Sequence, residues 1–282
     1  MSVLRTSVPD KYTIRMIFIS FLMLFLITLL VSLNTKSYPE GIEFPELVAI
    51  PNGSFYYLPA GSFRQGTRVV DAPMEVRKIS GLIELMKYPV SVREYDSCVK
   101  AGFCNEVAPS AGQNLAQTGV SYLDAIAYSQ WFTKITGDTW RLPKDEEWVR
   151  AASERFVAQK LSINSADPSK RWLAEYTKQH TERAGASSEL RSIGGYGENS
   201  LGAVDLSGSV WEWTQSCMLR GVVSVDGSTL TTKSEYCGIR IAEGRHRAFI
   251  IDFIRDPKVG GCAVGLPPNY LGFRLVREKR ND

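Results

Sequence analysis

Hydrophobic and polar residues alternate along this chain at two spacings, which predict helices near its middle and strands on either side. The helical spacing is clearest in residues 121–134, where the apolar side chains share one face. Ser121 can cap this helix, Asp124 stands at the capping-box position, and Gly137 can end it. We therefore expect an amphipathic helix here.

A second helix is predicted immediately after this one. Pro143 suits the first position of a helix, because its missing N–H would have no partner there. Asp145, Glu146 and Glu147 would then lie at the positive end of the helix dipole. Trp148 and the alanines that follow it are expected to pack inward.

Several shorter segments have the period of two that is typical of strands. Residues 47–55 are predicted as one strand closed by a turn, since residues 51–53 are Pro-Asn-Gly. Residues 76–86 fit one or two strands, and residues 271–277 fit a closing strand. A short helix starting at Val90 is predicted between residues 76–86 and the longer helices.

Residues 205–214 are predicted to begin as a turn and to end as a strand. Aromatic and β-branched residues dominate the second half, and they fit a pleated surface. The period of two places Trp211 and Trp213 on one side and Glu212 on the other. A carboxylate in that position needs a cation or hydrogen-bond donors.

The same turn could supply oxygen ligands for a metal ion. Asp205 and Glu212 offer carboxylates, and Gly208 and Val210 offer backbone carbonyls. Oxygen donors of this kind suit Ca²⁺. We therefore predict a candidate calcium site formed by Asp205, Gly208, Val210 and Glu212.

These elements together predict an α+β fold with much irregular backbone. Helices, many short strands and long glycine-rich loops are interspersed, without an internal repeat. Residues 162–188 are polar and are interpreted as a surface insertion. A net charge of +3 gives no reason to expect nucleic acid as a partner.

The N-terminal segment predicts a membrane anchor. Residues 16–34 are uncharged and almost wholly apolar, which is long enough to span a bilayer. Basic residues precede this segment and acidic residues follow it, so residues 1–15 should be cytoplasmic, residues 35–46 a spacer, and residues 47–282 extracytoplasmic. A cleaved signal peptide is the rival interpretation, but no Ala-x-Ala-like site follows the apolar run.

Five cysteines fit an oxidising compartment. Cys98 and Cys104 flank a short loop and are predicted to form a local disulfide. Cys217, Cys237 and Cys262 leave one residue over. If the segments around Cys217 and Cys237 are neighbouring strands of a long hairpin, these two residues form the second bridge. We expect a structural role for all five cysteines, and a free reactive Cys262 is the alternative.

Four blocks of sequence, in this order, resemble the formylglycine-generating-enzyme family, also called sulfatase-modifying factors. The blocks contain, among others, Arg-Leu-Pro-Lys-Asp-Glu-Glu-Trp, Gly-Ser-Val-Trp-Glu-Trp-Thr and Leu-Gly-Phe-Arg. They span almost all of the outer domain and cover residues 120–131, 141–148, 201–214 and 271–274. The resemblance implies a variant of the C-type lectin fold, and it assigns the predicted calcium ligands to a calcium site of the family.

The resemblance fails at the catalytic centre. Aerobic members of the family use two cysteines, five residues apart, to bind copper and activate oxygen; the matching positions here are His246 and Ile251. One His cannot replace two thiolates toward Cu(I), so we expect no copper. The iron-dependent relatives need three histidines, whereas this chain has only His180 and His246.

We therefore expect a single-pass protein of a bacterial inner membrane whose periplasmic domain is catalytically inactive and binds a periplasmic or envelope protein. The segments Cys237-Gly-Ile-Arg, Glu243-Gly-Arg-His-Arg and Gly260-Gly-Cys262 are similar to a non-sulfatase branch of the family. That branch includes proteins linked to copper nitrite reductase and periplasmic regulators of type VI secretion that act on a transmembrane kinase. A maturation factor for a periplasmic metalloenzyme and a formylglycine-generating oxidase are the alternatives. The predicted recognition surface comprises Arg245, His246, Arg247, Arg255 and Asp256.

Overall fold

The computed structural model describes residues 43–107, 112–157, 191–208, 210–251 and 271–278, together with single positions within 12–23 and 167–177. Contacts divide the chain into two units, residues 1–41 and residues 42–282, and the second contains all the elements discussed below. Among the described residues, no helix has both the length and the apolar character needed to cross a membrane. The predicted anchor and the predicted surface insertion lie almost entirely outside the described residues.

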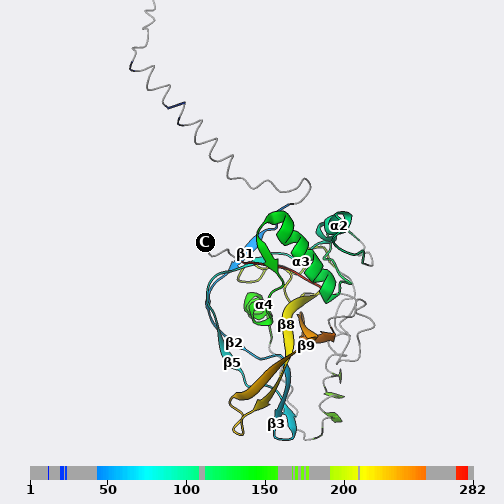
Figure 1. The fold of residues 1–282 in the computed structure, drawn as a ribbon. Coiled ribbons are helices and arrows are strands. Elements are labelled where there is room, and N and C mark those ends of the chain that lie inside the picture. The colour runs from blue at the N-terminus through cyan, green and yellow to red at the C-terminus, as the bar shows by residue number, and fades with distance from the viewer. Residues whose placement is uncertain are drawn as a thin grey trace, which may run out of the picture. The chain divides into compact units, whose positions relative to one another are not determined.

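The largest sheet is built on two long antiparallel strands, which form the ribbon at the centre of Figure 1. The order of its strands is β10-β9-β8-β3-β4, and β11 pairs in parallel with β8. Gly61 is required where β3 runs beside β8, because a Cβ there would lie 2.1 Å from the Leu219 carbonyl oxygen. The strands of this sheet are β3 Gly61–Gln65, β4 Arg68–Val70, β8 Trp211–Val223, β9 Leu230–Glu243, β10 Ala248–Ile251 and β11 Leu271–Gly272.

A second sheet joins the two ends of the domain. Its order is β1-β6-β12-β7, so the first and last strands both pair with β6. A separate two-stranded ribbon pairs β2 with β5. These strands are β1 Leu47–Ile50, β2 Gly53–Tyr57, β5 Glu75–Ile79, β6 Ile83–Met86, β7 Thr139–Arg141 and β12 Val276–Glu278.

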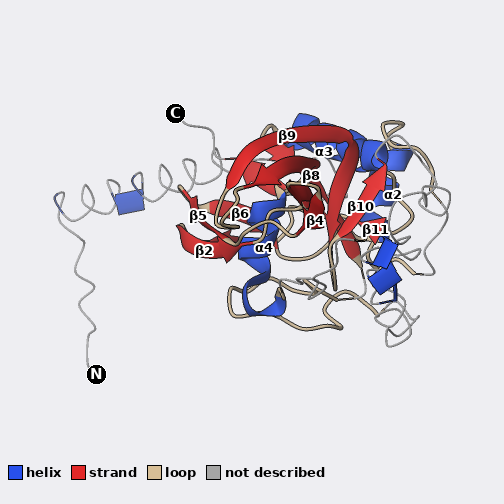
Figure 2. Cartoon of the chain, turned by 90° about the horizontal axis from the view of Figure 1, so that it is seen from below, coloured by secondary structure: helices blue, strands red, loops and turns tan. Residues whose placement is uncertain are grey.

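Helices cover part of these sheets, and Figure 2 draws them in blue. Helix α3, Tyr122–Thr136, has the predicted capping box between Ser121 and Asp124, and Gly137 ends it in the left-handed conformation (φ 71°). Helix α2, Val92–Lys100, lies beside α3 and is capped by Ser91. Helix α4, Asp145–Ala152, continues into the 3₁₀ turn η1, Ser153–Arg155.

Helix α4 begins two residues later than predicted. Pro143 lies outside it, and its carbonyl oxygen accepts a hydrogen bond from Gln215 N at 2.9 Å, which holds this segment against β8. The Glu147 carboxylate accepts from Lys144 N at 2.7 Å and closes the first turn at that point. A contact to a distant strand therefore decides where the helix starts.

Two of the predicted strands are divided in the structure. Residues 47–55 form parts of β1 and β2, since the chain turns at residues 51–52 and Gly53 has φ 151°. Residues 271–277 form β11 and part of β12, because the Phe273 and Leu275 carbonyls between them accept from Val90 N and Met86 N. The α+β class and the alternation along residues 211–213 are confirmed.

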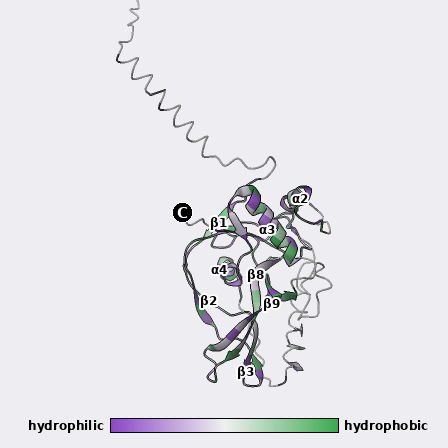
Figure 3. Cartoon of the chain, in the orientation of Figure 1, coloured by the Kyte–Doolittle hydropathy of each residue, from purple (hydrophilic) through white to green (hydrophobic). Residues whose placement is uncertain are grey.

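The core consists of three clusters of buried side chains. The largest is aromatic and joins α2 and α3 to the start of β8; within it the rings of Tyr95 and Tyr128 stack at 5.9 Å. Trp148 belongs to a second cluster under the β1–β6 sheet, and Phe63 to a small third one. Figure 3 shows hydrophilic residues beside hydrophobic ones along α3, as expected for a helix with one buried face.

Candidate functional site

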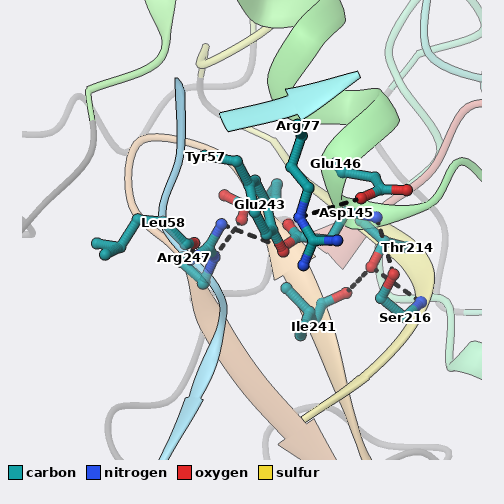
Figure 4. A network of polar contacts seen from close by, with 10 residues as sticks. All are labelled: Tyr57, Leu58, Arg77, Asp145, Glu146, Thr214, Ser216, Ile241, Glu243 and Arg247. Atoms are coloured by element: carbon teal, nitrogen blue, oxygen red, sulfur yellow. Dashed lines mark hydrogen bonds and ion pairs between the residues drawn. The ribbon is translucent and has the colours of Figure 1, made fainter. Parts of the chain in front are cut away.

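A buried network of charged side chains lies where β2, α4 and the end of β9 meet (Figure 4). Arg247 Nε donates to Glu243 Oε1 at 2.5 Å, and Arg247 Nη2 donates to Asp145 Oδ2 at 3.1 Å. The two carboxylate side chains are 0% and 1% exposed, and that of Arg247 is 14% exposed. One guanidinium charge therefore faces two carboxylates in a desolvated site.

Further contacts hold this network in place. The Tyr57 hydroxyl donates to Asp145 Oδ2, and Arg247 Nη1 donates to the Leu58 carbonyl at 2.7 Å. Asp145 N donates to Ser216 Oγ at 2.9 Å, which ties the start of α4 to β8. Three elements that are far apart in the chain are thereby fixed around Arg247.

The environment shifts the pKa values of three members of this network. Burial raises the pKa of Glu243 well above its usual range, and the Asp145 charge raises it further, although Arg247 opposes both. Burial also raises the pKa of Tyr57, and the negative charge of Asp145 adds to this. Burial alone would lower the pKa of Arg247, but the Asp145 and Glu243 carboxylates outweigh it and raise that pKa.

Two oxygens of the network are buried and have no donor among the described residues: Asp145 Oδ1 and Glu243 Oε2. Ionised carboxylates only accept hydrogen bonds, so two of them cannot satisfy one another. A proton held by Glu243 can be donated to Asp145, and it also removes the excess negative charge beside Arg247. The network is therefore suited to holding one proton at a fixed place.

A second buried ion pair lies at the start of β8. Arg274 is 0% exposed and uses all five of its N–H groups. Two of them donate to Glu212 at 2.7 Å, and the other three donate to the carbonyl oxygens of Met86, Lys87 and Val204. Trp148 Nε1 also donates to Glu212 Oε2 at 2.8 Å.

The four predicted calcium ligands are described by the structure, and their carboxylates have separate protein partners. The cation beside Glu212 is Arg274. Asp205 lies in the left-handed region (φ 62°), and its two carboxylate oxygens accept from Gly194 N at 2.6 Å and Tyr196 N at 2.8 Å. The need of Glu212 for a cation is therefore met by the protein itself; a calcium ion bound here together with Gly208 and Val210 stays a prediction.

Both predicted disulfides are confirmed. Cys98 pairs with Cys104, and Cys217 pairs with Cys237 between β8 and β9. Since the chain has five cysteines, only Cys262 remains, and it lies outside the described residues. The two positions that match the copper ligands of the resembled family hold His246, which is buried, and Ile251, so the residues present do not fit a copper site with two thiolates.

The described members of the predicted recognition surface do not form one exposed face, which corrects that prediction. Arg245 is exposed. His246 is buried against the Trp211 ring, with the ring centroids 4.9 Å apart, and Arg247 turns inward to Glu243 and Asp145. Arg255 and Asp256 lie outside the described residues. The physical reason is the buried pair of acidic groups, Glu243 and Asp145, which still carries one negative charge when Glu243 is protonated and therefore needs a cation.

Sequence reasoning missed the network around Arg247. The sequence pattern explains Asp145 only through the helix dipole, and it gives no reason to single out Tyr57. One signal was present: Glu243 and Arg247 are opposite charges four residues apart, next to the apolar residues of β10. That spacing indicates a local pair, but it does not reveal the contribution of Asp145 from 102 residues away.

Comparisons with known proteins agree with the arrangement of the sequence blocks. The model of a family described as sulfatase-modifying factor enzyme 1-like domain matches residues 35–279. The formylglycine-generating enzyme of Mycobacterium tuberculosis (strain ATCC 25618 / H37Rv) is 28% identical over 115 residues, which are 39% of this chain and 36% of that protein. The match thus spans about a third of the length of that relative.

The fold is also found in a solved structure of low sequence identity. The structure of PvdO from Pseudomonas aeruginosa matches with a TM-score of 0.54 and 19% identity, over 87% of this chain and 100% of that chain. Treponema denticola variable protein 1 matches with a TM-score of 0.48 and 13% identity, over 86% and 99% of the two chains.

Proposed function

Since this chain belongs to the sulfatase-modifying factor enzyme 1-like domain family, we propose that it uses the family's fold for binding and regulation, without the copper-dependent oxidation of cysteine. One observation carries the proposal. Four of the five cysteines are joined in two disulfides, which leaves Cys262 as the remaining cysteine. A Cu(I) site of the family's type requires two thiolates at a fixed separation.

The charged groups near the matching positions support the same proposal. Arg247 and Glu243 bind each other and Asp145 inside the fold. Their hydrogen bonds hold β2, α4 and β9 together, so this part of the domain serves the fold. We assign the binding role to groups on the surface. The network around Arg247 stabilises the fold.

The proposed setting is the outer face of a bacterial inner membrane, with the domain held by a single N-terminal span. The uncharged residues 16–34 support the span, and the basic residues before them support an N-terminus on the cytoplasmic side. The two disulfides support an oxidising compartment. The proposed partner is a periplasmic or envelope protein, such as a component of a type VI secretion kinase pathway.

A direct assay tests the loss of the oxidase reaction. The full-length protein, in neutral detergent, is incubated with a sulfatase-derived peptide that contains the target Cys, with and without added copper. The mycobacterial formylglycine-generating enzyme serves as the positive control, and the same peptide with Ser in place of Cys serves as the negative control. We expect no conversion; mass spectrometry showing an aldehyde at the target position would overturn the proposal.

A further inference from the structure

An open cavity of about 730 Å³ lies between the β8–β9 ribbon, the start of α4 and β5. Its volume is within the range of about 300–1,000 Å³ that is usual for ligand sites. The charged residues of its lining are unequal in number: four cations face two carboxylates. They are Arg77, Lys144, Lys233, Arg240, Glu146 and Glu235.

The two carboxylates do not neutralise all four cations. Arg77 pairs with Glu75 at 2.7 Å, outside the lining, and lies 3.9 Å from Glu146. Within the described part of the chain, the ammonium groups of Lys144 and Lys233 make no hydrogen bond and no ion pair. The cavity therefore presents an excess of positive charge to an incoming ligand.

Arg240 is held in a fixed position beside these lysines. Its guanidinium lies 4.4 Å from the centre of the Tyr122 ring, and Nη1 donates to the Gln215 carbonyl at 2.7 Å and to Cys217 Sγ at 3.0 Å. The disulfide from Cys217 to Cys237 ties the two strands together at this point. A cation that is already ordered loses little conformational entropy when a ligand binds.

The spacing of the cations indicates the shape of the ligand. Arg240 and Lys233 lie on β9, and their partners on β8 are Cys217 and Gly221, respectively. These positions are four residues apart, which corresponds to about 13 Å along a strand. Carboxylates four residues apart on an extended peptide have the same separation, so such a peptide matches the spacing of these two cations.

We propose that this cavity binds an acidic segment of a partner protein, whose carboxylates contact Lys144, Lys233 and Arg240. The inference rests on the proposed binding function and names the chemistry of the partner. Because the cavity is open, long-range attraction between the charges also speeds the encounter and weakens as salt is added.

The experiment uses the full-length protein in neutral detergent and a fluorescein-labelled peptide of six glutamates, with binding followed by anisotropy. We expect saturable binding that weakens with added salt, and no binding of the six-glutamine peptide. Lys144→Gln and Lys233→Gln should each weaken binding by about two- to fivefold, the usual size of an exposed charge contact. Lys78→Gln is the matched control, since Lys78 is exposed and points away from the face of β5 that carries Arg77.

Three results would overturn the inference. The first is binding of the six-glutamine peptide as tight as that of the six-glutamate peptide, and the second is a loss of affinity in Lys78→Gln as large as in the two other lysine variants. The third is displacement of the six-glutamate peptide by inorganic phosphate at the same concentration of charge, which would indicate a site for free anions. None of these bears on the sulfatase-peptide assay. Failure of the acidic-peptide site is therefore distinguishable from failure of the proposed function.

Discussion

Replacing Arg274 with Met removes the cation beside the buried Glu212 carboxylate and should destabilise the domain severely. Glu212 is 1% exposed, so without Arg274 its charge would retain one donor among the described residues, the Trp148 indole. Breaking a buried ion pair by removing one partner typically costs about 3–5 kcal/mol. For a domain of this size, that cost corresponds to a drop of about 6–20 °C in melting temperature.

A double-mutant cycle tests whether the charge of Glu212 causes this loss. Glu212→Gln alone should also be destabilising, because it leaves the Arg274 charge buried without its carboxylate. Arg274→Met combined with Glu212→Gln leaves no net charge in the site. We expect the double variant to lose about 2–3 kcal/mol less than the sum of the two single variants.

Arg277→Met is the matched control for this cycle. Arg277 pairs with Glu84 at 2.8 Å, but its side chain is 26% exposed, so the expected cost is at most about 1 kcal/mol. The assay is urea unfolding of the full-length protein in neutral detergent, followed by tryptophan fluorescence. The reasoning fails if Arg274→Met costs no more than Arg277→Met, or if the two single losses simply add.

Three further predictions concern protonation, calcium and topology. The raised pKa of Glu243 means that the folded state keeps a proton that the unfolded state releases above its ordinary pKa of 4.5. The stability that this proton contributes is fully present below that pH and is lost as pH rises through the folded pKa of Glu243, by at most about 1.4 kcal/mol per pH unit. Glu243→Gln should remove this slope of the unfolding free energy with pH, measured by urea unfolding. An unchanged slope would assign it to other groups. If calcium bridges Asp205 and Glu212, a chelator should lower the melting temperature of the domain. Asp205→Asn should abolish this sensitivity to chelator without breaking the ion pair of Glu212. Identical melting curves with and without chelator would contradict a calcium site here. Alkaline phosphatase fused to the C-terminus should be active in cells, whereas activity of a cytoplasmic reporter at the same place would contradict the predicted topology.

The two buried ion pairs occupy different places relative to the sequence blocks of the family. Arg274 and Glu212 lie in the sequence blocks that resemble the family, and they fix the start of β8. Arg247 and Glu243 lie close to the positions where an oxidase would need its thiolates. Here Arg247 and Glu243 serve the packing of β2, α4 and β9. The cavity lined by Lys144 and Lys233 has an excess of positive charge.

Several features of this protein were determined by the sequence alone, because they depend on residues only a few positions apart. Ser121 and Asp124 cap a helix wherever that helix packs, and Gly137 ends it since it adopts a positive φ without strain. The period of two placed the tryptophans 211 and 213 opposite Glu212. The six-residue separation of Cys98 and Cys104 allowed a local bridge.

Only the tertiary structure decided which distant groups share a buried site. Glu212 pairs with Arg274 from 62 residues away, and Asp145 with Arg247 from 102 residues away. No local pattern reports such pairs, because a carboxylate in an apolar segment demands a partner without indicating where in the chain the partner lies. The inward turn of Arg247 follows from the same demand: burial of Glu243 and Asp145 makes a charged neighbour favourable inside the fold, and this outweighs the preference of arginine for water.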